Sequence, residues 1–441
     1  MEEIVIKNGL VVSNDFKDSV IKADILVKED KIVNVGKDLK VNGAMVVDAS
    51  DKVVVPGFVQ PHIHLTQAIF RARADDLELM DFLKDRIWKF EGAHTSKSNY
   101  LSAKLGIAEL IRSGTTSFLD MGTVNHQESI FQAILESGIR GISGKCMMDI
   151  GDDVPDSLLE NTKDSIDKSV ELLEKWHGRD NGRIQYAFAP RFAPSCSDEL
   201  FGKVKELSRK YNTIIHTHAS ENRGEIELVM KLKKKKNIKY FLDMDLVSEK
   251  LVLAHCVWLD DEEIQILKDK GIKVAHCPNS NLKLASGFAK IPELIQAGID
   301  VGLAVDSSAS NNSYSVFSEM KTAGLIHKAR LLDPTIMDAK TVFKMATIGG
   351  AKVLGQEDKI GSIEKGKKAD LAILDLNLIE TSPYDEKDVF PTIVYSATHN
   401  NVETVMVDGK ILMEERKLKT IDEHALISEV KRQKMSTNQL P

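Results

Sequence analysis

The sequence predicts an α/β protein, a (β/α)8 barrel of the TIM type with a small β-sandwich domain formed by both chain ends. Eight apolar, strand-like runs alternate with amphipathic helical segments through the middle of the chain. Short strands separated by turns occupy the first residues, and a similar pattern returns near the end. A length of 441 residues exceeds what one ordinary core holds, so a large barrel with an accessory domain fits it.

The two chain ends share a pattern of short strands and tight turns. Turns such as "KNG" and "KED" separate the strands before residue 55, and "ADLAILDL" and "NNVETVMVDGKILMEERK" have the same character. We therefore predict that residues 1–55 and 361–441 form one small β-sandwich domain, which includes a helix from about 421 to 434. Residues 56–360 then form the barrel domain.

The predicted barrel strands are the runs at 53–65, 115–121, 141–149, 184–190, 213–221, 251–259, 273–279 and 301–308. Helical patterns lie between them, and several of these end in glycine, a common signal for the end of a helix. In barrels of this type, functional side chains sit at the carboxyl ends of the strands. Polar residues at these ends are therefore the candidates for a site.

Charge and composition argue against nucleic-acid and membrane partners. The formal net charge is -7, which disfavours binding to a phosphate backbone. No apolar run approaches the roughly 20 residues that a membrane helix needs, and no secretory segment opens the chain. The four cysteines are scattered, without the spacing of a metal site. These features predict a reduced, cytoplasmic protein.

Histidines collect at the ends of the predicted strands. The first strand ends in His62 and His64, the fifth in His216 and His218 with Glu221 following, the sixth in His255, the seventh in His276, and the eighth in Asp306. Residues i and i+2 of a strand face the same side, so the first two histidines can both point into the barrel mouth. A core or surface role would explain one such pair equally well, but a set on several strands indicates a site.

The predicted ligands of a metal ion are His62, His64, His218 and Asp306. Imidazole and carboxylate groups suit zinc, so we expect one Zn²⁺ per chain, with Fe²⁺ or Mn²⁺ as alternatives. A catalytic site of this kind keeps one position for water, whose pKa the metal lowers to about 7. In related barrels that hold two ions, a carboxylated lysine from the fourth strand bridges them. Here Arg191 follows the fourth predicted strand in place of such a lysine, which favours a single ion.

Catalytic roles follow from the position of the remaining groups. Glu221 follows the fifth strand, where a carboxylate can reach both the activated water and a bound heterocycle, so we predict it as the proton shuttle. Asp306 can accept the proton of the attacking water, and His255 can polarise the reacting centre or hold hydroxide in place. Such a site suits hydrolytic removal of an amino group from an aromatic ring. The roles of His216, which suits ligation and hydrogen bonding equally, and of His276 stay open.

Several motifs carry a family resemblance that runs nearly end to end. They are "PGFVQPHIHL", "HTHASE", "AHCVWL", "AHCPNSNLKLASG", "AVDSSASNN" and "GSIEKGKKADLAILD". Together they resemble the amidohydrolase superfamily, in the branch of nucleobase and nucleoside deaminases that is related to the triazine hydrolases. The resemblance implies the metal ligands named above, with Glu221 and His255 in catalysis. It also implies homo-oligomers, either dimers or tetramers.

Two sub-families compete for the substrate. The stretch "RARADDLELMDFLKDRIWKFE" resembles deaminases of 5′-modified adenosines, which implies that Glu91 binds the ribose hydroxyls. Gln67 and Arg191 instead resemble the base-reading residues of guanine deaminase, as do "GKCMMD" and "YAFAPRFAPSCS". The adenosine group commonly has histidine where this chain has Arg191. A guanidinium there suits a ring carbonyl, although it can also pair with a nearby carboxylate.

We therefore expect a deaminase of a small heterocycle, with Gln67, Glu91, Arg191 and His255 contacting the substrate. The main prediction is conversion of a 5′-modified adenosine, such as 5′-deoxyadenosine, methylthioadenosine or S-adenosylhomocysteine, to the inosine analogue and ammonia. Guanine, a related oxo-purine or a pterin is the close alternative, and an s-triazine is a further one. A catalytically inactive barrel that serves as a binding protein is disfavoured, because every ligand and Glu221 are present.

Overall fold

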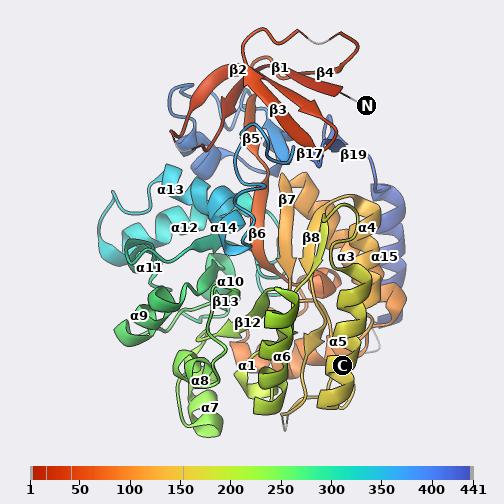
Figure 1. The fold of residues 1–441 in the computed structure, drawn as a ribbon, viewed down its shortest axis with the longest axis vertical. Coiled ribbons are helices and arrows are strands. Elements are labelled where there is room, and N and C mark those ends of the chain that lie inside the picture. Colours follow the sequence, from red (N-terminus) through yellow and green to blue (C-terminus); the bar gives the residue numbers. More distant parts are fainter. Residues whose placement is uncertain (1–2, 16, 41, 152, 438–441) are drawn as a thin grey trace.

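The computed structural model describes residues 3–15, 17–40, 42–151 and 153–437 (Figure 1). It contains one mixed nine-stranded sheet to which both chain ends contribute, in the order β19-β18-β17-β16-β5-β1-β2-β3, with β4 paired to β1. These strands are β1 (Glu3–Val12), β2 (Val20–Lys28), β3 (Lys31–Gly36), β4 (Met45–Asp48), β5 (Val53–Pro56), β16 (Leu371–Leu374), β17 (Val402–Val407), β18 (Lys410–Glu414) and β19 (Lys417–Leu418). Because β5 pairs with both β1 and β16, the first and last segments of the chain join there.

The middle of the chain forms parallel strands. Two four-stranded sheets have the orders β10-β8-β7-β6 and β12-β13-β14-β15, and β9 pairs with β11. Their bounds are β6 (Phe58–Ile63), β7 (Thr115–Asp120), β8 (Arg140–Ser143), β9 (Cys146–Met147), β10 (Ile184–Tyr186), β11 (Ala189–Pro190), β12 (Ile215–Ala219), β13 (Leu251–His255), β14 (Lys273–His276) and β15 (Val301–Leu303). Single parallel bridges, Phe188 to Ile215 and Ile63 to Asp306, link the two sheets at both edges. The carboxyl ends of these strands therefore face one side.

The first predicted strand, 53–65, is wrong as a single element. It forms two strands in two different sheets, β5 and β6, which separate at Gly57. A Cβ atom on Gly57 would lie 2.1 Å from Oγ1 of Thr116, so only glycine lets the chain pass so close to β7. Each of the other predicted runs contains at least one strand, although 141–149 and 184–190 are interrupted and each contribute two.

Helices surround the parallel strands (Figure 1). They are α1 (Leu79–Asp81), α2 (Trp88–Gly92), α3 (Ser96–Arg112), α4 (Gln127–Ser137), α5 (Thr162–Trp176), α6 (Asp198–Tyr211), α7 (Arg223–Lys233), α8 (Asn237–Asp243), α9 (Asp261–Lys270), α10 (Pro278–Lys283), α11 (Ile291–Gln296), α12 (Val316–Leu331), α13 (Ala339–Lys344), α14 (Gly350–Val353) and α15 (Glu423–Thr437). Local signals fix their ends: Asp260 and Glu263 form a capping box at the start of α9, and Gly271 ends it with φ of 64°. In the part of the chain that the structure describes, no helix has the length and apolar character needed to cross a bilayer.

A buried ion cluster joins the parallel strands to the nine-stranded sheet. Nε of Arg140, in β8, donates to Asp370 at 2.7 Å, and its Nη2 also contacts Asp408. Arg140 and Asp370 are almost fully buried. Buried charges are tolerated only when they are well paired. Because Arg140 pairs with both carboxylates, this one side chain helps to fix how the two sheets lie relative to each other.

Candidate active site

The predicted site residues lie at the carboxyl ends of the parallel strands. His62 belongs to β6 and His64 follows it, His218 belongs to β12, His255 ends β13, and Asp306 lies just beyond β15. The backbone N–H of His64 donates to the carbonyl of Asp306 at 2.9 Å, which joins the first and last parallel strands at the site. His255 and Asp306 have φ of 74° and 65°, a left-handed conformation that is rare outside glycine and is concentrated at functional sites.

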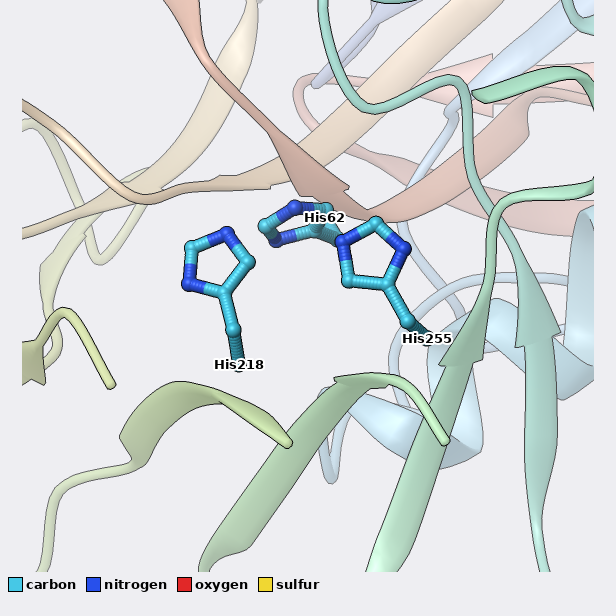
Figure 2. Close-up of side chains that lie close together, drawn as sticks. All are labelled: His62, His218 and His255. Carbon is cyan, nitrogen blue, oxygen red and sulfur yellow. The ribbon is translucent and has the colours of Figure 1, made fainter. Parts of the chain in front are cut away.

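The atoms of these residues that could ligate a metal ion converge. Those of His62, His218 and His255 all lie within 4.8 Å of one another, and so do those of His62, His64 and Asp306. Figure 2 shows the first of these groups, with the three rings turned toward one another from separate strands. The sequence prediction assigned His255 to catalysis and substrate binding, and the structure puts its ring among the metal-binding groups as well.

Hydrogen bonds on the outer side of three rings, those of His62, His218 and His255, fix their orientation. Nδ1 of His218 donates to the carbonyl oxygen of Arg191 at 2.7 Å, and Nδ1 of His255 lies 2.9 Å from Oδ1 of Asn281. Nδ1 of His62 shares a hydrogen bond of 2.8 Å with Nε2 of His216. These contacts leave the Nε2 atoms for the centre of the cluster, as is usual for histidine ligands. His216 therefore has the position of a residue that orients His62.

Asp306 presents one oxygen to the cluster and the other to two serines. Its Oδ1 lies 3.3 Å from Nε2 of both His62 and His64, while Oδ2 accepts hydrogen bonds from Ser280 at 2.6 Å and Ser310 at 2.7 Å. Burial opposes ionisation, yet the nearby His62 and His64 hold the pKa of Asp306 well below its usual range. Sequence reasoning missed both serines, although each lies in a motif that carried the resemblance.

The donor set fits a divalent cation. Burial lowers the pKa of His62 and holds the pKa of His64 and His218 well below the usual value, so these imidazoles are neutral and offer lone pairs. The buried Nε2 of His62 makes no hydrogen bond within the described residues. Neutral imidazoles beside an ionised carboxylate are the ligand types that zinc and similar ions prefer.

Glu221 lies beside this cluster, two residues after β12. Burial raises its pKa well above the usual value; the charge of Asp306 adds to this effect and Arg191 opposes it. Its Oε2 lies 3.5 Å from Nε2 of His255. A carboxyl group with a raised pKa, next to the histidine cluster, is placed to hold and transfer a proton.

Gln67, Glu91 and Arg191 meet in one buried network. Nη1 of Arg191 donates to Oε2 of Glu91 at 2.6 Å, and Nε2 of Gln67 donates to Oε1 of Glu91 at 2.8 Å. The alternative in which Arg191 pairs with a carboxylate is thus observed. Gln67 and Arg191 also line the same cavity as His64, His218 and Asp306.

Apolar side chains complete the cavity. They are Leu79, Phe82, Leu83, Phe192 and Leu284. Sequence reasoning missed them, because an apolar residue at a cavity has the same signature as one in the core.

His276 belongs to neither group of potential metal ligands among the described residues; its ring packs against that of His327, with centroids 5.6 Å apart.

The fold and the cluster of histidine and aspartate are those of a metal-dependent hydrolase, and the family comparison agrees. Residues 53–412 match the model of the amidohydrolase family, so the chain belongs to that family, whose fold is of the TIM-barrel type. The resemblance found in the sequence motifs is therefore confirmed.

Similar proteins are known from archaea and bacteria. The chain is 42% identical to a 5-methylthioadenosine/S-adenosylhomocysteine deaminase of Thermococcus onnurineus, over 94% of this chain and 95% of that protein. It is 41% identical to a 5'-deoxyadenosine deaminase of Methanobrevibacter smithii, over 97% of each chain. Among solved structures, an adenosine deaminase from Xanthomonas campestris with bound zinc superposes with a TM-score of 0.91, at 29% identity over 99% of this chain and 98% of the other.

Proposed function

We propose that this protein is a mononuclear metal-dependent aminohydrolase that converts a 5′-modified adenosine to its inosine analogue and ammonia. The observation that carries the proposal is the convergence of neutral histidines, ionised Asp306 and protonatable Glu221 in one cavity. Relatives at about 40% identity that are named as deaminases of 5′-deoxyadenosine and of methylthioadenosine and S-adenosylhomocysteine support the substrate class.

The proposal includes a closed (β/α)8 barrel over residues 56–360 and a small β-sandwich formed by residues 1–55 and 361–441. The bridges at both edges of the parallel sheets support closure of the barrel. A shared apolar core that includes Ile25, Val54 and Leu371 supports folding of the nine-stranded sheet upon itself. All four cysteines are unpaired and buried, which is in keeping with a cytoplasmic protein. We also propose that the protein forms a homo-oligomer, which a sedimentation experiment would test.

His62, His64, His218 and Asp306 would hold the metal ion, with His255 close enough to join them. We propose zinc, which when bound supplies Lewis-acid activation of water at neutral pH. The neutral state of the histidines matters here, because a protonated imidazole cannot ligate. Iron or manganese would suit the same donors, and metal analysis of the purified protein separates them.

Glu221 and Asp306 carry out the proton transfers of the deamination reaction. Water adds to C6 of the purine, so a carbon–oxygen bond forms, and Glu221 delivers a proton to N1 of the ring. Asp306 takes a proton from the attacking water, and that proton reaches the amino group. The carbon–nitrogen bond then breaks and ammonia leaves. The hydroxyl group on C6 returns its proton to Glu221, and C6 becomes a carbonyl. His255, held by Asn281, is positioned to stabilise the developing charge at the reacting oxygen.

Glu91 is proposed to accept hydrogen bonds from the ribose hydroxyls. Its contacts with Arg191 also bear on the guanine alternative. A guanidinium that is already paired with a buried carboxylate is a poor candidate for reading a ring carbonyl, which favours the nucleoside over guanine.

A coupled assay for ammonia release tests the proposal. The substrates are 5′-deoxyadenosine, methylthioadenosine, S-adenosylhomocysteine, adenosine, guanine and a pterin, each with zinc-loaded protein. We expect turnover of the 5′-modified adenosines and little of the free bases. Preferred turnover of guanine or the pterin would overturn the substrate assignment, and release of no ammonia from any of them would overturn the reaction.

A further inference from the structure

We infer that Arg191 is a positioning residue that connects the metal-binding half of the site to the sugar-binding half. Its side chain holds Glu91 for the ribose hydroxyls, and its main-chain carbonyl orients the metal ligand His218. This inference rests on the proposed function, because it assigns the way in which the substrate's sugar is held. It also replaces the role in which Arg191 reads a carbonyl of the base.

Arg191 is the charged partner of the buried Glu91 side chain. Glu91 is 3% exposed, and a buried carboxylate without partners is strongly disfavoured. Nη1 and Nη2 of Arg191 approach its two oxygens at 2.6 and 3.4 Å, a bidentate arrangement that fixes the carboxylate plane as well as its charge. Arg191 is itself buried, so the two charges depend on each other.

The contacts leave Glu91 with capacity for one more donor. An ionised carboxylate offers about four lone-pair positions. Oε1 accepts from Gln67 and from Nη2 of Arg191, while Oε2 accepts only from Nη1 of Arg191 among the described residues. Oε2 therefore keeps a lone-pair position for a sugar hydroxyl, and both partners of the carboxylate, Gln67 and Arg191, line the cavity. Gln67 belongs to the short helix Leu65–Phe70, which directly follows His64, so this network also reaches the metal-binding strand.

The main chain of Arg191 acts on the other half of the site. Its carbonyl oxygen accepts from Nδ1 of His218 at 2.7 Å, which directs Nε2 of His218 to the cluster. The same carbonyl accepts from the backbone N–H of His218 at 3.0 Å. Both contacts survive replacement of the side chain. Substitution of Arg191 should therefore affect the sugar contact and leave metal binding intact.

The experiment compares two variants on two substrates. Arg191→Gln removes the charge, and Arg191→Lys keeps the charge but loses the bidentate geometry. Each is assayed with adenosine and with 2′,3′-dideoxyadenosine, which lacks the hydroxyls that Glu91 would bind. Zinc content is measured on the same preparations, and circular dichroism and thermal unfolding monitor the fold.

For adenosine we expect kcat/KM to fall about tenfold to hundredfold in Arg191→Gln, mostly through KM, because a hydrogen bond to a charged group is lost. The fall should be under about threefold for the dideoxy substrate. Zinc per chain should stay at the wild-type level. Glu91→Gln should likewise lower kcat/KM for adenosine much more than for the dideoxy substrate. Adding Arg191→Gln to Glu91→Gln should lower kcat/KM little further, because both changes break the same ion pair.

Equal losses on both substrates would overturn the inference, as would loss of zinc in a variant that remains folded. Should Arg191→Gln fail to fold, Arg191→Lys decides by the same comparison. Wild-type protein that deaminates neither these nucleosides nor any 5′-modified adenosine would instead refute the proposed function.

Discussion

Nε2 of His64 lies 3.3 Å from Oδ1 of Asp306, although 241 residues separate them, and the backbone N–H of His64 also donates to the carbonyl of Asp306. A main-chain hydrogen bond between the ends of the first and last parallel strands therefore brings these two side chains together. Two potential metal ligands are fixed relative to each other before any ion binds.

Removal of Asp306 should therefore cost both metal and activity. In Asp306→Ala the histidines lose their anionic partner, and we expect zinc per chain to fall well below one, with ammonia release reduced at least about a thousandfold. Plasma emission spectroscopy and the ammonia assay measure the two effects. Asp269→Ala, at an exposed acid in α9, is the matched control. Wild-type zinc content in Asp306→Ala would remove Asp306 from the ligand set.

Glu221→Gln should separate metal binding from chemistry. The amide keeps the size of the side chain but cannot carry a proton between water and the ring, so turnover should fall by about 10²–10⁴ while zinc stays bound. Single-turnover assays on zinc-loaded protein test this. Activity within a few-fold of wild type would exclude Glu221 as the proton shuttle.

The cavity should discriminate against a phosphate group at the 5′ position. Among the described lining residues Arg191 is the only permanent cation, and it is neutralised by Glu91, while Leu79, Phe82, Leu83 and Leu284 are apolar. A phosphate would lose its hydration there without a counter-charge. We expect kcat/KM for adenosine 5′-phosphate to lie at least about a hundredfold below that for 5′-deoxyadenosine. Comparable values for the two substrates would contradict this assignment of the cavity.

Arg140→Met should destabilise the whole protein. The change leaves Asp370 and Asp408 without their shared partner, and breaking a buried ion cluster in this way typically costs about 3–5 kcal/mol. A lower midpoint of chemical unfolding is the expected result. Adding Asp370→Asn and Asp408→Asn should recover part of the loss, because the uncompensated charges are then removed. An unchanged midpoint in Arg140→Met would show that the cluster contributes nothing to stability.

Stability should also fall in mild acid through His94. Burial lowers the pKa of His94 to about 4, against the opposing hydrogen bond with the carbonyl of Thr66, whereas the unfolded value is about 6.5. The unfolded chain therefore binds a proton first as the pH falls, and the free energy of unfolding decreases from pH 6.5 to pH 4, by up to about 3 kcal/mol. Denaturant titrations of His94→Gln should show a smaller decrease over this range. The exposed His424→Gln should behave as wild type, and a pH profile unchanged in His94→Gln would refute the role of His94.

The sequence identified the strands and the residues that meet at their ends, because both depend on local patterns. Histidine at positions 62 and 64 of an apolar run is visible without a structure. The break at Gly57 was missed, because the close approach of Thr116 that requires glycine is a tertiary contact. The pairing of Arg191 with Glu91 joins residues 100 positions apart, and only the folded chain shows that the guanidinium is already engaged.

The position of β5 also sets an order for biosynthesis. This strand lies between β1, made at the start, and β16, whose last residue is Leu374. A chain emerging from the ribosome has one edge of β5 unpaired until nearly all of it has been translated, and an open edge invites association with other strands. Since β5 runs into β6, the strand of His62, through Gly57 alone, the segment next to the candidate site gains its last neighbouring strand late in synthesis.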